Sequence, residues 1–282
     1  MTSQDSIVHF EPLLRLTAFL GVFGAVALWE ALAPRRSRAL RRLTRWPHNL
    51  GLLLVDIITV RLLAPGAAIA VAVAGEANGW GLLNVWSLPL WGAALVAVLL
   101  LDLAIYFQHV MFHAVPTLWR LHRVHHADLD FDVTTGTRFH PLEIIISTAI
   151  KCAAIAAIGA PVVSVFAFEV LLNASSMFNH ANASVPQGFE HGLRLLVVTP
   201  DMHRVHHSVH YDESSNNFGF NLPWWDRIFG TYHAQPKMGH DAMNVGVDAF
   251  RAPEEVRLDR LLLQPFRDTP GRYPINRRQG AG

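Results

Sequence analysis

The sequence has few charged residues for its length. Only 16% of its 282 residues are charged, against about 25% in an average soluble globular protein. Hydrophobic residues make up 51% of the chain, and the mean hydropathy is +0.26. The net charge of +1 gives no global field that would attract nucleic acid. The shortage of charge therefore indicates a protein of the bilayer rather than a soluble or nucleic-acid-binding one.

Cysteine and the common cofactor motifs are also missing. Cys152 is the single cysteine, which excludes an intrachain disulfide and any cysteine-cluster metal site. It lies in an apolar run, where packing is the expected role. The sequence has no nucleotide-binding glycine fingerprint and no haem or four-cysteine motif. Any electrons that the protein uses must therefore come from a separate reductase, ferredoxin or cytochrome.

Long apolar stretches stand out instead. A helix that spans a bilayer needs about 20 mostly apolar residues, and residues 13–33, 50–75 and 83–107 meet this need. Residues 144–177 are too long for one span, and Gly159-Ala160-Pro161 divides them. We therefore predict an all-α, integral membrane helical bundle with about four membrane regions, of which the last is a helical hairpin.

Basic residues are unevenly distributed between the loops. The loop after the first span is rich in arginine, whereas residues 76–80 contain no Lys or Arg. The positive-inside rule places the arginine loop, and with it His109 and everything after the hairpin, in the cytoplasm. The arginines are expected to set this topology and to contact lipid headgroups. They are Arg35, Arg36, Arg38, Arg41, Arg42 and Arg45.

Histidine is the compositional anomaly, with 16 copies. His109 and His113 are four residues apart, and the pentad His-Arg-Val-His-His occurs twice, with its histidines at i, i+3 and i+4. Each of these spacings puts its members on one face of a helix. Thr199-Pro200-Asp201 predicts a helix start just before the second pentad. The pentad histidines are His122, His125 and His126, then His203, His206 and His207.

The number of clustered histidines favours two metal ions. Neutral imidazole binds iron, zinc, copper and nickel, and one ion takes at most about six ligands. Eight clustered histidines exceed that limit. His180, after the hairpin, is a further candidate ligand, and His140, before it, is a candidate ligand or hydrogen-bond donor. Carboxylates that could orient ligand histidines are Asp102, Asp128, Glu143 and Asp201. His240 is expected to be a surface or interface residue.

These motifs resemble the fatty acid hydroxylase / sterol desaturase superfamily. The resemblance rests on residues 121–126, 135–143, 199–208 and 225–232, and it covers about residues 102–232. It implies that two iron ions, replaceable by zinc on isolation, bind His109, His113, His122, His125, His126, His180, His203, His206 and His207. Better-known members carry a further histidine where this sequence has Ser184. His140 is the residue expected to take its place.

The resemblance implies an O2-dependent di-iron enzyme that hydroxylates or desaturates a lipid, or cleaves an ether lipid. Acid–base groups do not break unactivated C–H bonds, so a redox metal must carry such a reaction. The substrate would be a sterol, fatty acyl chain or related lipid that enters from the bilayer. Its electrons would come from a ferredoxin, cytochrome or reductase.

Three other classes of protein stay open. A membrane protein that transports or stores metal would line a path at bilayer depth with its ligands. A haem protein would use pairs of axial histidines within a helical bundle. A zinc hydrolase would use the same nitrogen ligands without redox chemistry.

The predicted organisation has four regions. Residues 1–49 hold a membrane helix and the basic loop, residues 50–108 two membrane helices, and residues 109–233 the His-rich catalytic region with the hairpin 142–178. Residues 234–282 form a polar C-terminal tail. The expected location is a bacterial inner membrane, with a helical cap on the cytoplasmic side that holds the metal. Trp224 and Trp225 are expected to seat this cap on the headgroups.

Overall fold

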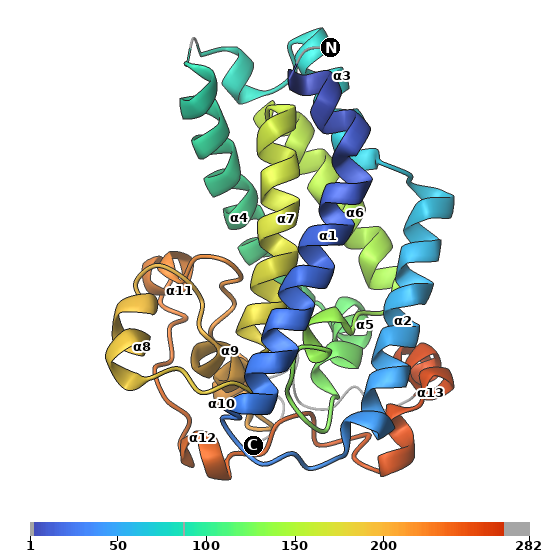
Figure 1. Ribbon diagram of the computed structural model, residues 1–282, viewed down its shortest axis with the longest axis vertical. Helices are drawn as coiled ribbons and strands as arrows, with labels where there is room; N and C mark the ends of the chain where they lie inside the picture. The colour runs from blue at the N-terminus through green and yellow to red at the C-terminus, as the bar shows by residue number, and fades with distance from the viewer. Residues whose placement is uncertain (1–2, 87, 268–282) are drawn as a thin grey trace.

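The computed structural model describes residues 3–86 and 88–267, which are almost entirely helical. Long helices run along the long axis of the molecule, and most of the short helices gather at one end, the lower end in Figure 1. We call the described residues at this end that lie outside the long helices, 115–140 and 181–267, the cap. The predicted all-α fold is confirmed. The long helices are α1 (Ser3–Leu32), α2 (Arg42–Leu63), α4 (Leu90–Ala114), α6 (Pro141–Ile158) and α7 (Val162–Asn179).

The long helices are apolar enough to cross a membrane. Within the described residues the stretches that qualify are Phe10–Leu32, Arg42–Asn84, Leu90–Ala114, Pro141–Ile158 and Val162–Asn179. Their outward faces carry exposed leucines, such as Leu20 on α1 and Leu95 on α4, as lipid-facing helices do. These stretches agree with the predicted four membrane regions, since the last two form the hairpin.

The hairpin turns where the sequence predicts it. α6 ends at Ile158, its C-cap residue Gly159 has a φ of 70°, and Pro161 comes just before the first residue of α7. A left-handed backbone favours glycine, and a Cβ at Gly159 would collide with the carbonyl oxygen of Trp80. The turn therefore reverses the chain, and it also packs closely against the loop before α4.

The second predicted span, residues 50–75, differs from expectation because it consists of two helices. α2 ends at Leu63, and α3 (Ala67–Asn78) begins after Pro65 and Gly66, whose φ is 63°. Proline removes a backbone donor and glycine takes the left-handed conformation, so the chain bends here. α3 then packs against α6 and α7.

The interior of the bundle is closely packed and apolar. Its core joins α3, α4, α6 and α7 through buried side chains that include Ala72, Ala97, Leu101, Val165 and Phe168. α1 lies along α7. The lower ends of α4 and α7 are thereby fixed relative to one another, and both carry histidines.

The arginine loop lies at the same end of the bundle as the cap, but several of its side chains bind protein. Arg45 is fully buried, and its guanidinium lies 2.6 Å from Asp128 and 2.8 Å from Asp132. Arg35 pairs with Asp201 and Asp241 of the cap. The prediction that these arginines contact headgroups is therefore wrong for Arg35 and Arg45, which hold the cap.

Residues 234–267, the described part of the predicted polar tail, pack against the rest of the protein. α13 (Leu258–Leu263) lies against α2, and Leu261 is buried in one cluster with Leu52 and Val124. The guanidinium of Arg123 donates to the carbonyl oxygens of Gln264 (2.5 Å) and Arg267 (2.9 Å). The rest of the predicted tail, residues 268–282, lies outside the described residues, and the division into four regions stays a prediction.

Candidate metal centre

Nine of the ten predicted ligand histidines converge where the bundle meets the cap. None of them is more than 6% exposed. α4 supplies two from its last turns, α5 (Pro116–His126) supplies three, and one caps the end of α7. α9 (Pro200–His206) and its C-cap residue supply the rest. They are His109, His113, His122, His125, His126, His180, His203, His206 and His207.

Each pentad lies at the end of a short helix that starts with proline. Pro116 opens α5 and Pro200 opens α9. Thr199 caps α9 as predicted, since its hydroxyl oxygen accepts a hydrogen bond from the Met202 N–H at 3.3 Å. The backbone N–H of the first helical residue has no partner within the helix, so a proline, which lacks this N–H, is tolerated there. Because each helix begins before its pentad, the histidines at i, i+3 and i+4 lie on one helix face.

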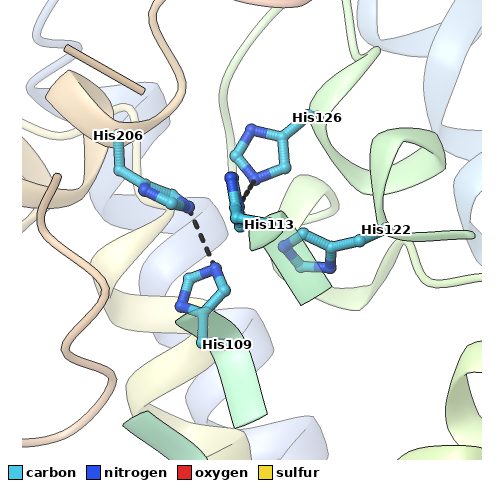
Figure 2. Close-up of side chains that lie close together, drawn as sticks. All are labelled: His109, His113, His122, His126 and His206. Atoms are coloured by element: carbon cyan, nitrogen blue, oxygen red, sulfur yellow. Dashed lines mark hydrogen bonds between the residues drawn. The ribbon is translucent and has the colours of Figure 1, made fainter. Parts of the chain in front are cut away.

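The nine histidines form two groups that each could hold one ion. The five-histidine group contains His109, His113, His122, His126 and His206, which point toward one another in Figure 2. The four-histidine group contains His125, His180, His203 and His207. Within each group, one nitrogen of every residue lies within 4.8 Å of the others. Each pentad gives two histidines to one group and its middle histidine to the other.

The nitrogen atoms of the five-histidine group call for a cation. The Nδ1 of His109 donates to the carbonyl of Phe218 (2.8 Å), and that of His206 to the carbonyl of Asn216 (2.7 Å). A neutral imidazole has one N–H, so neither residue has a hydrogen left on Nε2. These two Nε2 atoms are nevertheless 2.9 Å apart (Figure 2). Two lone pairs at this distance repel each other unless both bind the same cation.

The four-histidine group has the same feature around His180. Its Nδ1 donates to the carbonyl of Ser176 at 2.7 Å, which leaves Nε2 without a hydrogen. That Nε2 lies 3.0 Å from the Nε2 of His125 and 3.1 Å from those of His203 and His207. The donor set therefore fits a second cation.

Burial keeps these imidazoles neutral. It lowers the pKa of His122 and of His180 to about 3. Burial and the neighbouring imidazoles also hold the pKa values of His125 and His207 well below their usual 6.5. At neutral pH the lone pairs are consequently available to a metal.

One predicted carboxylate orients a histidine, and others do not. Glu143 is buried in the first turn of α6 and lies 2.6 Å from the Nδ1 of His122. Asp102 instead accepts hydrogen bonds from Asn221, Leu222 and Trp225. The prediction for Asp102 is therefore wrong, because this carboxylate ties the cap to α4.

Asp128 and Asp201 do not orient the histidines of either group. Asp128 pairs with Arg45 and Arg138. Those two guanidinium groups hold the pKa of Asp128 below its usual range despite its burial. Asp201 pairs with Arg204 and Arg35. Both carboxylates join the cap to its surroundings.

Residues 94–231, which contain every histidine of both groups, match the family model described as fatty acid hydroxylase. This segment, just under half of the chain, belongs to the fatty acid hydroxylase family. This confirms the resemblance that the motifs indicate. No solved structure matches the chain.

Named relatives in this family act on lipids. The chain is 28% identical to an ornithine lipid hydroxylase of Rhizobium tropici over 232 residues, 78% of this chain and 67% of the relative. It is 30% identical to the alkylglycerol monooxygenase of Homo sapiens over 190 residues, 66% of this chain and 40% of the relative. It is 25% identical to the cholesterol 25-hydroxylase of Mus musculus over 143 residues, 50% of this chain and 47% of the relative. The matched region spans less than half the length of the last two relatives.

In this member of the family, His140 stands apart from both groups. It caps α6, where its Nδ1 accepts a hydrogen bond from the Leu142 N–H at 3.2 Å, and its Nε2 lies 3.2 Å from the Leu262 carbonyl. Ser184 is exposed, and its N–H bonds the Ala33 carbonyl at the end of α1. The structure therefore does not bring His140 to the position expected for a tenth histidine.

Oxygen atoms and aromatic rings that the sequence did not indicate surround the histidines. The carbonyls of Ser176, Asn216 and Phe218 orient ligand candidates, but a backbone carbonyl has no sequence signal. Phe139 stacks on His125 with ring centroids 4.5 Å apart. Its place directly before His140 gave no sign of this contact.

Proposed function

We propose that this protein is a membrane-bound di-iron oxygenase that hydroxylates a lipid C–H bond. One atom of O2 would enter the C–H bond, and two electrons from a separate donor with two protons would reduce the other atom to water. The observation that carries the proposal is the pair of buried histidine groups in which nitrogen lone pairs face one another. Two cations at these groups would remove that repulsion.

Iron is the metal proposed because of the chemistry required. Imidazole binds iron and zinc alike, but zinc has no redox chemistry. When bound, iron would supply the electrons that activate O2. His109, His113, His122, His126 and His206 would hold one ion, and His125, His180, His203 and His207 the other.

The residues of the chain would orient the ligands and exclude water. Glu143 and the carbonyls of Phe218 and Asn216 fix which nitrogen of each histidine carries the proton. Phe131 and Phe218, each 1% exposed, cover the histidines with apolar rings. A dry site of this kind protects an oxidising reaction from side reactions with solvent.

Hydroxylation is favoured over desaturation. The named relatives are hydroxylases or monooxygenases, as their names state. The substrate class is an amphipathic lipid, because the bundle that carries the histidines is apolar enough to lie in a bilayer. We further propose that the cap lies on the cytoplasmic side of a bacterial inner membrane. The arginine loop at the same end of the bundle supports this orientation.

Metal transport is the less favoured alternative. A transporter presents its ligands along a path through the membrane. Here both groups lie at one end of the bundle under the cap, and every member is buried.

Metal analysis and lipidomics would test the proposal. The purified protein, reconstituted with ferrous iron without oxygen, should hold two irons per chain and give a Mössbauer spectrum of two ferrous sites. A host that expresses it under O2 should gain a lipid heavier by one oxygen atom, and 18O2 should label it. The zinc-loaded protein should bind as much metal and form no product. A single metal ion per chain would refute the dinuclear proposal, and a lipid lighter by two hydrogens would indicate desaturation.

A further inference from the structure

One side of the cap carries large apolar side chains, although it lies outside the stretches that are long and apolar enough to cross a membrane. It is formed by α8 (Gln187–Leu193), α11 (Trp224–Ile228) and the residues that follow each of them. Soluble proteins rarely expose apolar patches larger than a few hundred Å². We call this side the α8–α11 surface. Its apolar side chains, each 40% to 72% exposed, are Phe189, Leu195, Leu196, Trp224, Ile228 and Phe229.

The charged side chains of α8 and the residues after it point inward. Residues 187–197 contain two charged residues, Glu190 and Arg194. Both are buried, and they pair with each other at 2.7 Å. Arg194 also donates to the carbonyl of Ala234 at 2.8 Å. A helix that faces water shows the reverse arrangement, with its charged side chains outward. The outward side of this segment therefore suits an apolar environment.

The α8–α11 surface is continuous with the lipid-facing side of α4. The indole N–H of Trp224 donates to the carbonyl of Leu195 at 2.7 Å, which joins its two parts. Trp224 and Ile228 are four residues apart on α11 and so lie on one helix face. The ring of Phe229 lies 5.1 Å from that of Phe107, which is exposed within the membrane stretch of α4.

The height of these elements along the bundle supports the same conclusion. Figure 1 shows α8 and α11 at the height of the lower turns of α1 and α7, and above the lower end of α2. In contrast, α12 (Gly239–Ala242) lies at the lowest end of the molecule. The apolar stretch of α1 extends down to Leu32. A bilayer that covers this stretch therefore reaches α8 and α11 as well.

We propose that the α8–α11 surface lies within the bilayer and contacts lipid acyl chains, while α12 and the lower part of the cap lie in water. Segments of this kind bury their apolar side about 5–10 Å into the boundary between headgroups and acyl chains. The lipids are those that surround α4, since the two surfaces are continuous. Of the two tryptophans expected to seat the cap on headgroups, Trp224 belongs to this surface, whereas Trp225 donates its indole N–H to Asp102.

Spin labels would measure the depth of this surface in a membrane, with no need for metal or substrate. The full-length protein with Cys152→Ser would carry a nitroxide at Phe189→Cys, Leu196→Cys or Ile228→Cys. It would be placed in vesicles of phosphatidylcholine and phosphatidylglycerol. Oxygen concentrates among acyl chains, whereas a charge-neutral nickel chelate stays in water. We expect collisions with oxygen to exceed those with the chelate severalfold at all three positions.

Met238→Cys provides a matched control. Met238 is also a large apolar side chain of the cap and is 53% exposed, but it comes directly before α12 at the lowest end of the molecule. Its label should collide mainly with the nickel chelate. Equal preference for the chelate at positions 189, 196 and 228 would place the α8–α11 surface in water and refute the proposal. Protection from both reagents would show that a second copy of the chain covers the surface, which would refute it as well.

Charged substitutions give a second test. Charged side chains are unfavourable within a bilayer, so Leu195→Asp combined with Leu196→Asp should move the surface toward water. The excess of oxygen collisions at a label on position 228 should then fall severalfold, whereas Met238→Asp should leave it unchanged. A circular dichroism spectrum like that of the unaltered protein would show that each variant is folded. An unchanged oxygen excess in the double variant would contradict the proposal.

Discussion

His125 lies in the four-histidine group and His206 in the five-histidine group, although each is the fourth residue of the same pentad. The remaining two histidines of each pentad lie in the other group. Each group therefore requires both α5 and α9, and neither helix can build a metal site alone. The two groups are coupled through the backbones of these helices.

Removing either exchanged histidine should affect metal binding. His206→Ala takes away the Nε2 that faces His109, and His125→Ala takes away one of the three that face His180. We expect metal content to fall from two ions toward one and oxidation to drop more than about a hundredfold, since even indirect partners of ligands are worth ten- to hundredfold. His191→Ala, an exposed histidine, is the control. Full metal content and activity in either variant would exclude that residue as a ligand.

Glu143 should matter through His122. Its carboxylate accepts the Nδ1–H of that ring. Glu143→Ala should lower metal affinity or activity about ten- to hundredfold, and Glu143→Gln, which keeps an acceptor oxygen, should recover part of the loss. Metal titration followed by spectroscopy would measure both. Equal affinity in Glu143→Ala and the unaltered protein would show that this contact does not orient the ligand.

His140→Ala should leave the metal in place. His140 caps α6 and belongs to neither group. Loss of a helix cap costs about 1 kcal/mol, so thermal stability should fall slightly. Metal per chain, measured by elemental analysis, should stay at two. A loss of one ion would show that His140 reaches the centre in the loaded protein.

Arg45 should be the arginine of the loop that matters most for stability. Arg45→Met removes the guanidinium that Asp128 and Asp132 share, so that Arg138 alone pairs with Asp128, and breaking a buried ion pair costs about 3–5 kcal/mol. We expect the unfolding temperature in detergent to fall by roughly 10 °C. Arg41→Ala changes an exposed residue of the same loop and should change it little. Similar values for the two variants would contradict the role assigned to Arg45.

His240 should make the cap sensitive to acid. It is 6% exposed, and burial lowers its pKa from 6.5 to about 4. Between these two pKa values, the imidazole of His240 binds a proton only when the segment around it unfolds and exposes it. The packed form of this segment therefore loses stability as the pH falls from about 6.5 to 4. The full effect is up to about 3 kcal/mol.

Hydrogen exchange of residues 236–245 would measure this loss. His240→Gln keeps a donor for Gln235, which the His240 Nε2 contacts at 3.0 Å. The variant should lose part of the pH dependence between pH 4 and 6.5 that the unaltered protein shows. If hydrogen exchange depended on pH in the same way in both proteins, groups other than His240 would cause the acid sensitivity.

Local patterns in the sequence predicted the helices well, and they singled out nine histidines that the structure brings together. The i, i+3, i+4 spacing placed the histidines on helix faces because helical geometry fixes that relationship. Gly159 and Pro161 marked the hairpin turn for equally local reasons. The bend at Pro65 carries the same kind of signal, but the surrounding hydropathy concealed it.

Long-range pairing could not be predicted. The division of the histidines into two groups depends on how α5 packs beside α9, and no spacing within either helix contains that information. Arg45 pairs with Asp128, which lies 83 residues further along the chain. The sequence therefore showed a basic loop where the structure has a buried ion pair. His140 resembled a ligand because its neighbours match a family motif, whereas its side chain caps a helix.

The contact of Arg123 with the carbonyls of Gln264 and Arg267 has a consequence for the order of events during synthesis. Arg123 belongs to the first pentad, yet the segment that holds it leaves the ribosome after all nine histidines. Until then, the outer side of α5 lacks its cover, and the histidines can exchange metal with their surroundings. We expect the nascent chain to load metal quickly and the finished protein to release it slowly. The metal found in the purified protein would then record which ion was abundant when the chain was made.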